Sequence, residues 1–98
     1  MNTKHTPGPW NISSANRYAV NASGRGIATA EGADDVKYSE FFPPTEEAAA
    51  NARLIAAAPD LLERCIIIER LLLPMANNPA NDNFMRELRA AIAKATNP

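Results

Sequence analysis

The stretch WNISSANRYAVNASGRGIATA, residues 10–30, decides the fold class. Apolar and polar side chains alternate within it in three short segments, a pattern that is typical of half-buried β-strands. These segments are 10–14, 17–21 and 26–30. They are separated by a turn at Ala15–Asn16 and by a second turn in which Gly24 and Gly26 are able to adopt positive φ. The pattern predicts a three-stranded antiparallel meander with one apolar face, which another element must cover.

Residues 31–44, EGADDVKYSEFFPP, are expected to form a loop. The loop mixes charged residues with four large side chains, Val36, Tyr38, Phe41 and Phe42. A loop of this length without regular structure is usually functional or flexible. A further edge strand over residues 36–39 is the alternative.

Residues 45–98 are predicted to be helical. Thr45 is placed to cap a helix that runs to Ala58, and Pro59 is expected to end it or to begin the next one. A second helix is expected from about Asp60 to Leu73. A third follows a cap at Asn81 or Asp82 and carries an apolar stripe at helical spacing. The stripe consists of Phe84, Met85, Leu88, Ala91, Ile92 and Ala95.

The chain is therefore expected to be α+β, with an N-terminal three-stranded antiparallel β-meander followed by two or three α-helices packed on one face. Its 98 residues fit one domain spanning residues 1–98, divided into the meander (1–30), the loop (31–44) and the helical part (45–98).

The composition excludes several classes of protein. Hydrophobic residues make up 46% of the chain, which is too high for a disordered protein, and the net charge of −1 does not favour direct binding of nucleic acid. The single cysteine, Cys65, fits a reducing compartment. No signal peptide is visible, and the longest apolar run is interrupted by Glu69 and Arg70. We expect a soluble, cytoplasmic protein with no membrane partner.

The second predicted helix is apolar around most of its circumference. Four of its charged residues, Asp60, Glu63, Arg64 and Arg70, share one sector of the helical wheel. Ile67 and Leu71 project into that same sector. One interpretation is a central helix that is buried between the sheet and the other helices. The other is that Ile67 and Leu71 form the interface of a homo-oligomer, most often a two-fold dimer. A partner protein is a third use of this surface.

The sequence offers no convincing catalytic or metal-binding set. His5 is the only histidine, and no cysteine or carboxylate cluster gives it the spacing of a metal ligand. The GRG of residues 24–26 lacks the lysine and the helix of a phosphate loop, so a hairpin turn is favoured. The pair Asp34–Asp35 has no third acid to complete a cation site. We expect no enzyme activity, no cofactor and no metal.

The segment HTPGPW, residues 5–10, is interpreted as a stiff entry that seats Trp10 in the core. Proline fixes φ and disfavours helix in the residue before it. A ligand-stacking role for Trp10 is secondary, and Arg53 is a second possible ligand-binding residue. As an isolated polar residue among alanines, Arg53 also fits the solvated side of its helix.

Two stretches resemble a widespread group of small phage and prophage proteins. They are HTPGPW at residues 5–10 and ANARLIAAAPDLLER at residues 50–64. The Ile27–Ala28 pair and RAAIAKAT at residues 89–96 are further points of resemblance. The resemblance implies a phage setting and no particular biochemical activity. Small accessory phage proteins commonly act by binding host machinery.

The leading hypothesis is a non-enzymatic phage protein that inhibits a bacterial defence component, such as a CRISPR effector, by protein–protein interaction. The expected contact residues are Arg25, Tyr38, Phe41 and Phe42, because arginine and aromatic side chains dominate interface energetics. The alternative is an oligomeric sponge that sequesters a nucleotide immune signal. Arg25, Arg53 and Trp10 would then hold the phosphate and the base.

Overall fold

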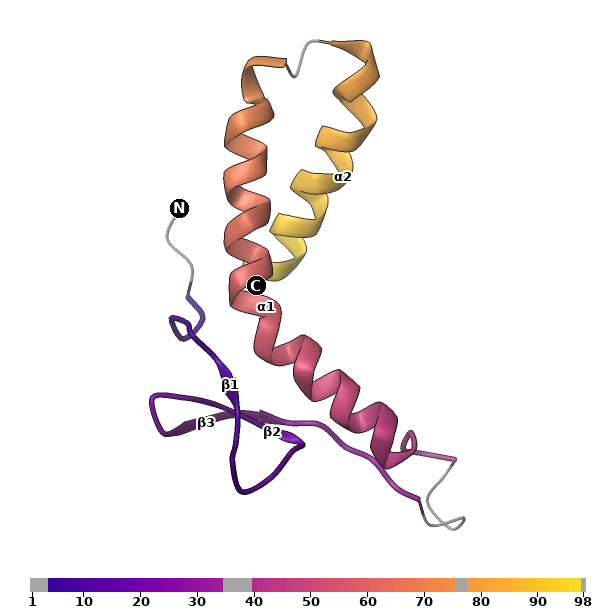
Figure 1. Cartoon of the computed structure of the whole chain (residues 1–98). Helices are drawn as coiled ribbons and strands as arrows, with labels where there is room; N and C mark the ends of the chain where they lie inside the picture. Colours follow the sequence, from indigo (N-terminus) through magenta and orange to yellow (C-terminus); the bar gives the residue numbers. More distant parts are fainter. Residues whose placement is uncertain (1–3, 35–39, 76–77, 98) are drawn as a thin grey trace. The chain divides into compact units, whose positions relative to one another are not determined.

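A computed structural model describes residues 4–34, 40–75 and 78–97. Its elements in chain order are β1 (Asn11–Ile12), β2 (Ala19–Ala22), β3 (Arg25–Thr29), α1 (Thr45–Leu72), the 3-10 turn η1 (Leu73–Met75) and α2 (Pro79–Thr96), as Figure 1 shows. An antiparallel sheet followed by two helices confirms the predicted α+β class. The alternative edge strand at 36–39 lies outside the described residues.

The chain divides into two compact units. Residues 6–59 form the sheet unit, which contains the three strands and the first part of α1. Residues 60–98, together with the segment before residue 6, form the hairpin unit, which contains the second part of α1 and all of α2. The single domain over residues 1–98 stays a prediction.

The sheet is a meander in the order β1-β2-β3, with antiparallel pairing throughout. The β2–β3 hairpin turns at Ser23 and Gly24, whose φ angles of 50° and 77° are left-handed, as a two-residue hairpin requires. Of the two glycines able to adopt positive φ, Gly24 does so, and the other left-handed position is Ser23. The register shifts at Ile27, which stands between the paired residues Gly26 and Ala28 and bulges from β3.

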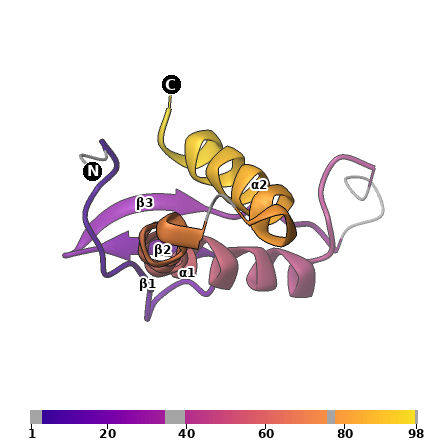
Figure 2. The same cartoon turned by 90° about the horizontal axis from the view of Figure 1, so that it is seen from above.

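The core of the sheet unit is made almost entirely of small side chains. Val20 and Ala22 are buried on one face of β2, and Ala48, Ala49 and Ala52 are buried on one face of α1. Alanine allows another segment to approach the helix axis closely, and Figure 2 shows the first part of α1 running beside the sheet. Among the residues that the structure describes, Val20 is the one large side chain that is fully buried.

Both helix boundaries at prolines differ from the prediction. Pro59 lies inside α1, so the expected break into two helices is wrong. The helix retains its other hydrogen bonds around the one that proline cannot make. α2 begins at Pro79, not after a cap at Asn81 or Asp82. Proline is well tolerated in the first turn of a helix, and the Asn78 carbonyl accepts a hydrogen bond from the Asn81 N–H at 2.9 Å.

The hairpin unit packs α2 along one narrow stripe. Met85 and Ile92 are buried, and Leu88 between them is half-buried. An ion pair joins the two helices, with Arg89 Nε 3.2 Å from Glu69 Oε1. No described residue between 60 and 72 is buried, so the interpretation of this stretch as a central, enclosed helix is wrong. Its apolar side chains face outward to a large extent.

Candidate functional site

The loop between β3 and α1 is closed at its base by backbone contacts. The Ala33 N–H donates a hydrogen bond to the Pro43 carbonyl at 2.8 Å, which joins the two arms of the loop. Gly32 lies so close to α1 that an added Cβ would stand 2.5 Å from the Cβ of Ala48. Only glycine fits this approach, because carbon atoms pack at about 3.5–4.0 Å. The loop therefore leaves the sheet along a defined path.

A side-chain clamp reinforces this base. Asp34 accepts two hydrogen bonds from Thr45, one from its hydroxyl at 2.5 Å and one from its backbone N–H at 3.0 Å. The hydroxyl bond, then the N–H bond and the charge of Arg17, lower the pKa of the Asp34 carboxyl below its ordinary value. Thr45 was expected to cap α1, but it is the first helical residue and the carboxylate of Asp34 caps it. Asp34 was considered only as a poor metal ligand, so its role was missed.

The clamped loop presents an exposed aromatic side chain. Phe41 is 72% exposed, and Phe42 next to it is half-buried. The two phenylalanines immediately precede Pro43, and the Pro43 carbonyl accepts the hydrogen bond that closes the base of the loop. Tyr38, the third aromatic contact residue that the sequence indicated, lies outside the described residues. The described part of the loop thus combines a fixed base with an exposed aromatic side chain close to it.

Arg25 is not brought together with these aromatic residues. It is the first residue of β3, exposed beside the hairpin turn, whereas the loop follows the other end of that strand. The hairpin turn and the loop lie at opposite ends of the sheet in both views (Figures 1 and 2). A partner that contacts Arg25 and Phe41 at once must span the length of the sheet.

The HTPGPW segment packs on α1. The indole N–H of Trp10 donates a hydrogen bond to the Thr6 carbonyl at 3.0 Å, across the cis Gly8–Pro9 peptide. A Cβ added to Gly8 would stand 3.3 Å from the Cβ of Pro59. Trp10 is half-buried, so the segment acts as the expected stiff entry, with its tryptophan at the edge of the core.

Trp10 and Arg53 do not form an evident ligand site. Arg53 is exposed and lies six residues before Pro59, which places the two about 120° apart around α1. The turn that carries Trp10 therefore packs on a different side of the helix from Arg53. A joint role of these two residues in ligand binding stays a prediction.

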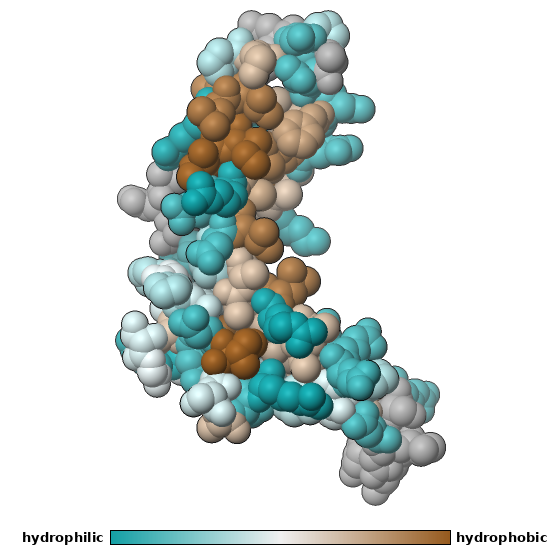
Figure 3. All heavy atoms as spheres, in the orientation of Figure 1, coloured by the Kyte–Doolittle hydropathy of each residue, from teal (hydrophilic) through white to brown (hydrophobic). Residues whose placement is uncertain are grey.

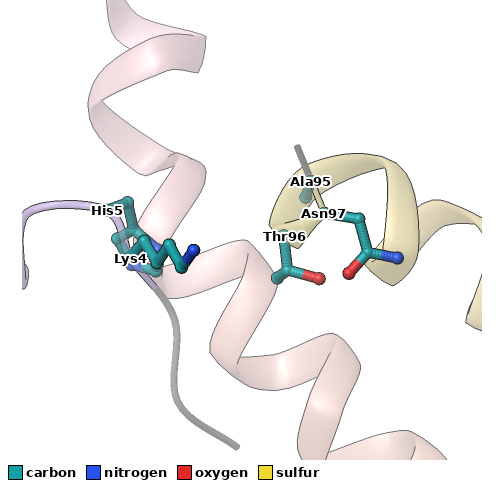
Figure 4. A pocket seen from close by; sticks show the side chains of 5 residues that line it. All are labelled: Lys4, His5, Ala95, Thr96 and Asn97. Atoms are coloured by element: carbon teal, nitrogen blue, oxygen red, sulfur yellow. The ribbon is translucent and has the colours of Figure 1, made fainter.

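A shallow hollow of about 330 Å³ lies in the hairpin unit, where the end of α2 approaches the N-terminal segment. It is lined by Lys4, His5, Ala95, Thr96 and Asn97 (Figure 4). The Thr96 hydroxyl donates back to the Ile92 carbonyl at 2.9 Å, and the Lys4 side chain extends toward this helix end, whose partial charge is negative. Among the described residues, no group of three or more potential metal ligands gathers here or elsewhere.

A family model described as Salmonella phage P22 protein Y8K6 matches residues 1–98. The chain belongs to this phage protein family. No curated protein and no solved structure matches the chain. The family membership confirms the resemblance to small phage proteins at the level of a phage origin. In the described part of the chain, no helix is long and apolar enough to cross a membrane.

In this member of the phage P22 Y8K6 family, the two stretches that carried the resemblance contact each other. Residues 5–10 reach residues 50–64 where Gly8 packs on Pro59. The proline at 59 therefore has a packing role inside α1, and the glycine at 8 leaves room for it.

Proposed function

We propose that this phage protein acts without catalysis, by binding a bacterial defence protein through the loop of residues 31–44 and blocking it. The observation that carries the proposal is the exposed Phe41 on a loop whose base is fixed by Gly32 and Asp34. A loop whose base is already fixed loses less conformational entropy when it binds. An exposed aromatic side chain on such a loop has the character of an interface hot spot. The phage origin supports a bacterial target.

The charge around the loop defines the kind of surface it fits. Glu31, Glu40, Glu46 and Glu47 are all exposed at or near the loop, and Asp34 adds a carboxylate at its base. Exposed carboxylates near an exposed aromatic side chain complement a basic surface with an apolar pocket. Defence effectors that bind nucleic acid carry such basic grooves, because they neutralise phosphates. A CRISPR effector is therefore the target we propose first, with Phe41, Phe42 and Tyr38 as central contacts and Arg25 as a separate, peripheral one.

The test is phage plating on cells that carry a defence system directed against the infecting phage. Wild-type protein is expected to raise the plating efficiency, and the double variant Phe41→Ala with Phe42→Ala is expected to lose this effect. Leu54→Ala is the matched control, because Leu54 is also a strongly exposed apolar residue of the sheet unit but lies on α1. Thermal unfolding of all three purified proteins checks that they are folded.

Two outcomes contradict the proposal. A folded double variant that inhibits as well as wild type shows that the loop is not the binding site. Inhibition that persists when the protein is far below the concentration of its target indicates turnover, and so an enzyme.

The nucleotide sponge remains the second candidate. Its residues Trp10 and Arg53 lie on different sides of α1, and the indole N–H already donates to Thr6, so the described geometry favours it less. A cyclic nucleotide that binds the folded state raises the unfolding free energy by about 2.7 kcal/mol at 100 times its Kd. A thermal-shift screen with cyclic nucleotides tests this directly.

A further inference from the structure

The hairpin unit leaves several large apolar side chains substantially exposed. Six large apolar side chains are between 40% and 69% exposed, which together amounts to about three whole side chains. They are Leu61, Ile68, Leu71, Leu73, Met75 and Phe84. Figure 3 shows apolar side chains gathered on one face, over the upper part of α1 and the facing start of α2. With about 150 Å² for each whole side chain, the exposed apolar area is roughly 450 Å².

The spacing of these residues on α1 is that of a helix–helix seam. Leu61 and Ile68 are seven residues apart, and Leu71 follows Ile68 by three. Residues at these intervals lie on one face of a helix and pack against a second helix in coiled coils and helical bundles. The sequence had singled out Ile67 and Leu71, but Ile67 is half-buried, whereas Ile68 and Leu71 are both exposed. The seam is thus turned by one residue from the face first expected.

We propose that this face binds a second copy of the chain, so that two hairpin units form a four-helix bundle about a two-fold axis. A two-fold contact uses the same patch on both copies. The exposed apolar area of the six side chains is more than half of the area of about 800 Å² per partner that stable interfaces bury. The charged residues around these side chains supply the polar rim. This inference is independent of the proposed function, which concerns the loop of the sheet unit.

Charge complementarity favours an antiparallel arrangement of the two α1 helices. Arg64 lies within the seam, between Leu61 and Ile68, and a parallel pair would place Arg64 beside its own copy. Reversing the second helix about a point near residue 66 instead places Leu61 opposite Leu71 of the second copy.

The same reversal gives Arg64 an acidic partner. The two helices of the hairpin are antiparallel, so the contact between Glu69 and Arg89 places Glu87 at the same height along the hairpin as Leu71. Glu87 also lies three residues after Phe84, on the same exposed side of α2. Arg64 of one copy then comes within one helical turn, about 5 Å along the axis, of Glu87 of the second copy. Two such pairs form, one on each side of the axis.

The first experiment measures the mass of the purified full chain in solution by light scattering and sedimentation over a range of concentrations. Wild type is expected to be a dimer at micromolar concentration. Leu71→Glu is expected to weaken the dimer at least 100-fold, because it places two charges in the seam. Phe41→Glu is the matched control: it changes a comparably exposed apolar residue outside the hairpin unit and should leave the dimer intact. Since Leu71 is 69% exposed in the single chain, its replacement should not unfold the monomer, which circular dichroism checks.

A charge-swap series tests the arrangement without touching the apolar residues. Arg64→Glu and Glu87→Arg are each expected to weaken the dimer about tenfold, because each sets like charges opposite one another. The double variant should restore wild-type affinity.

A wild type that is monomeric over the whole range of concentrations overturns the proposed surface. A folded Leu71→Glu that remains a dimer overturns it as well. If the charge variants weaken the dimer and the double swap does not restore it, the antiparallel arrangement is wrong.

Discussion

Gly32→Ala tests whether the loop leaves the sheet unit along the path seen in the structure. The added Cβ would stand 2.5 Å from the Cβ of Ala48 and 3.3 Å from both the Pro43 carbonyl oxygen and the Thr45 Cα. None of these atoms is the end of a flexible side chain. The overlap can be relieved only by moving the backbone of the loop away from α1, which strains the clamp between Asp34 and Thr45.

The expected cost follows from this overlap. A carbon–carbon distance of 2.5 Å is at least about 1 Å shorter than a favourable contact. Overpacking of this kind destabilises proteins by about 1–3 kcal/mol, and the fixed surroundings place Gly32→Ala in the upper half of that range. For a chain of this size, a loss of about 2 kcal/mol lowers Tm by roughly 8–16 °C.

The measurement is urea and thermal unfolding of wild type and four variants, followed by circular dichroism. Gly26→Ala is the matched control, because nothing lies within 4 Å of a Cβ added there, and its unfolding free energy should stay within about 0.5 kcal/mol of wild type. Ala48→Gly removes the methyl group that Gly32→Ala strikes, at a helix cost of about 1 kcal/mol. The combined variant should therefore be more stable than the sum of the two single changes allows. A Gly32→Ala protein as stable as Gly26→Ala would refute the close approach of the loop to α1.

Two further predictions concern charged side chains. Because the pKa of Asp34 is lowered, its carboxylate stabilises the fold above the unfolded-state pKa of about 3.9, and this contribution is lost as the pH falls through the lower folded-state pKa. The urea midpoint of wild type should therefore fall more steeply between about pH 5 and pH 2 than the midpoint of Asp34→Asn. Parallel curves for the two proteins would contradict the clamp. In the hairpin unit, a double-mutant cycle of Glu69→Gln and Arg89→Ala should give a coupling free energy of about 0.3–1 kcal/mol, since the ion pair is partly exposed. This coupling should shrink in about 1 M salt. No coupling at low salt would show that the pair does not form.

The parts of the fold that depend on neighbouring residues were predictable from the sequence. The period-two alternation of residues 10–30 is a local signal, and it placed all three strands. The first turn was expected at Ala15–Asn16 but lies at Arg17–Tyr18, where the Asn16 side-chain oxygen accepts a hydrogen bond from the Tyr18 N–H at 2.9 Å. The start of α2 was also a local signal, but it was misread. Asn78–Pro79 is a cap followed by a proline in the first helical turn, and it was interpreted as a break.

The arrangement of the candidate site depended on contacts that no local pattern records. Asp34 and Thr45 are 11 residues apart, and nothing in the intervening residues indicates that their side chains meet. The pairing of Gly8 with Pro59 joins positions that are far more distant. Aromatic content alone indicated Phe41 and Phe42, and their fixed stem was beyond the reach of sequence patterns. Sequence patterns also could not show that Ile68 is exposed while Ile67 is half-buried, because the covered face of α1 depends on where α2 packs.

The distribution of apolar side chains explains why the two units have different physical needs. The sheet unit buries mainly alanines and Val20, so it gains little from burial and depends on close backbone approaches at Gly8 and Gly32 and on the clamp at Asp34. The hairpin unit holds most of the large aliphatic side chains, yet fully encloses only Met85 and Ile92 among its described residues. Two helices alone offer too few neighbours to cover such residues, whereas four helices enclose a shared core. The second copy that we propose would supply the hairpin unit with the burial that a single chain lacks.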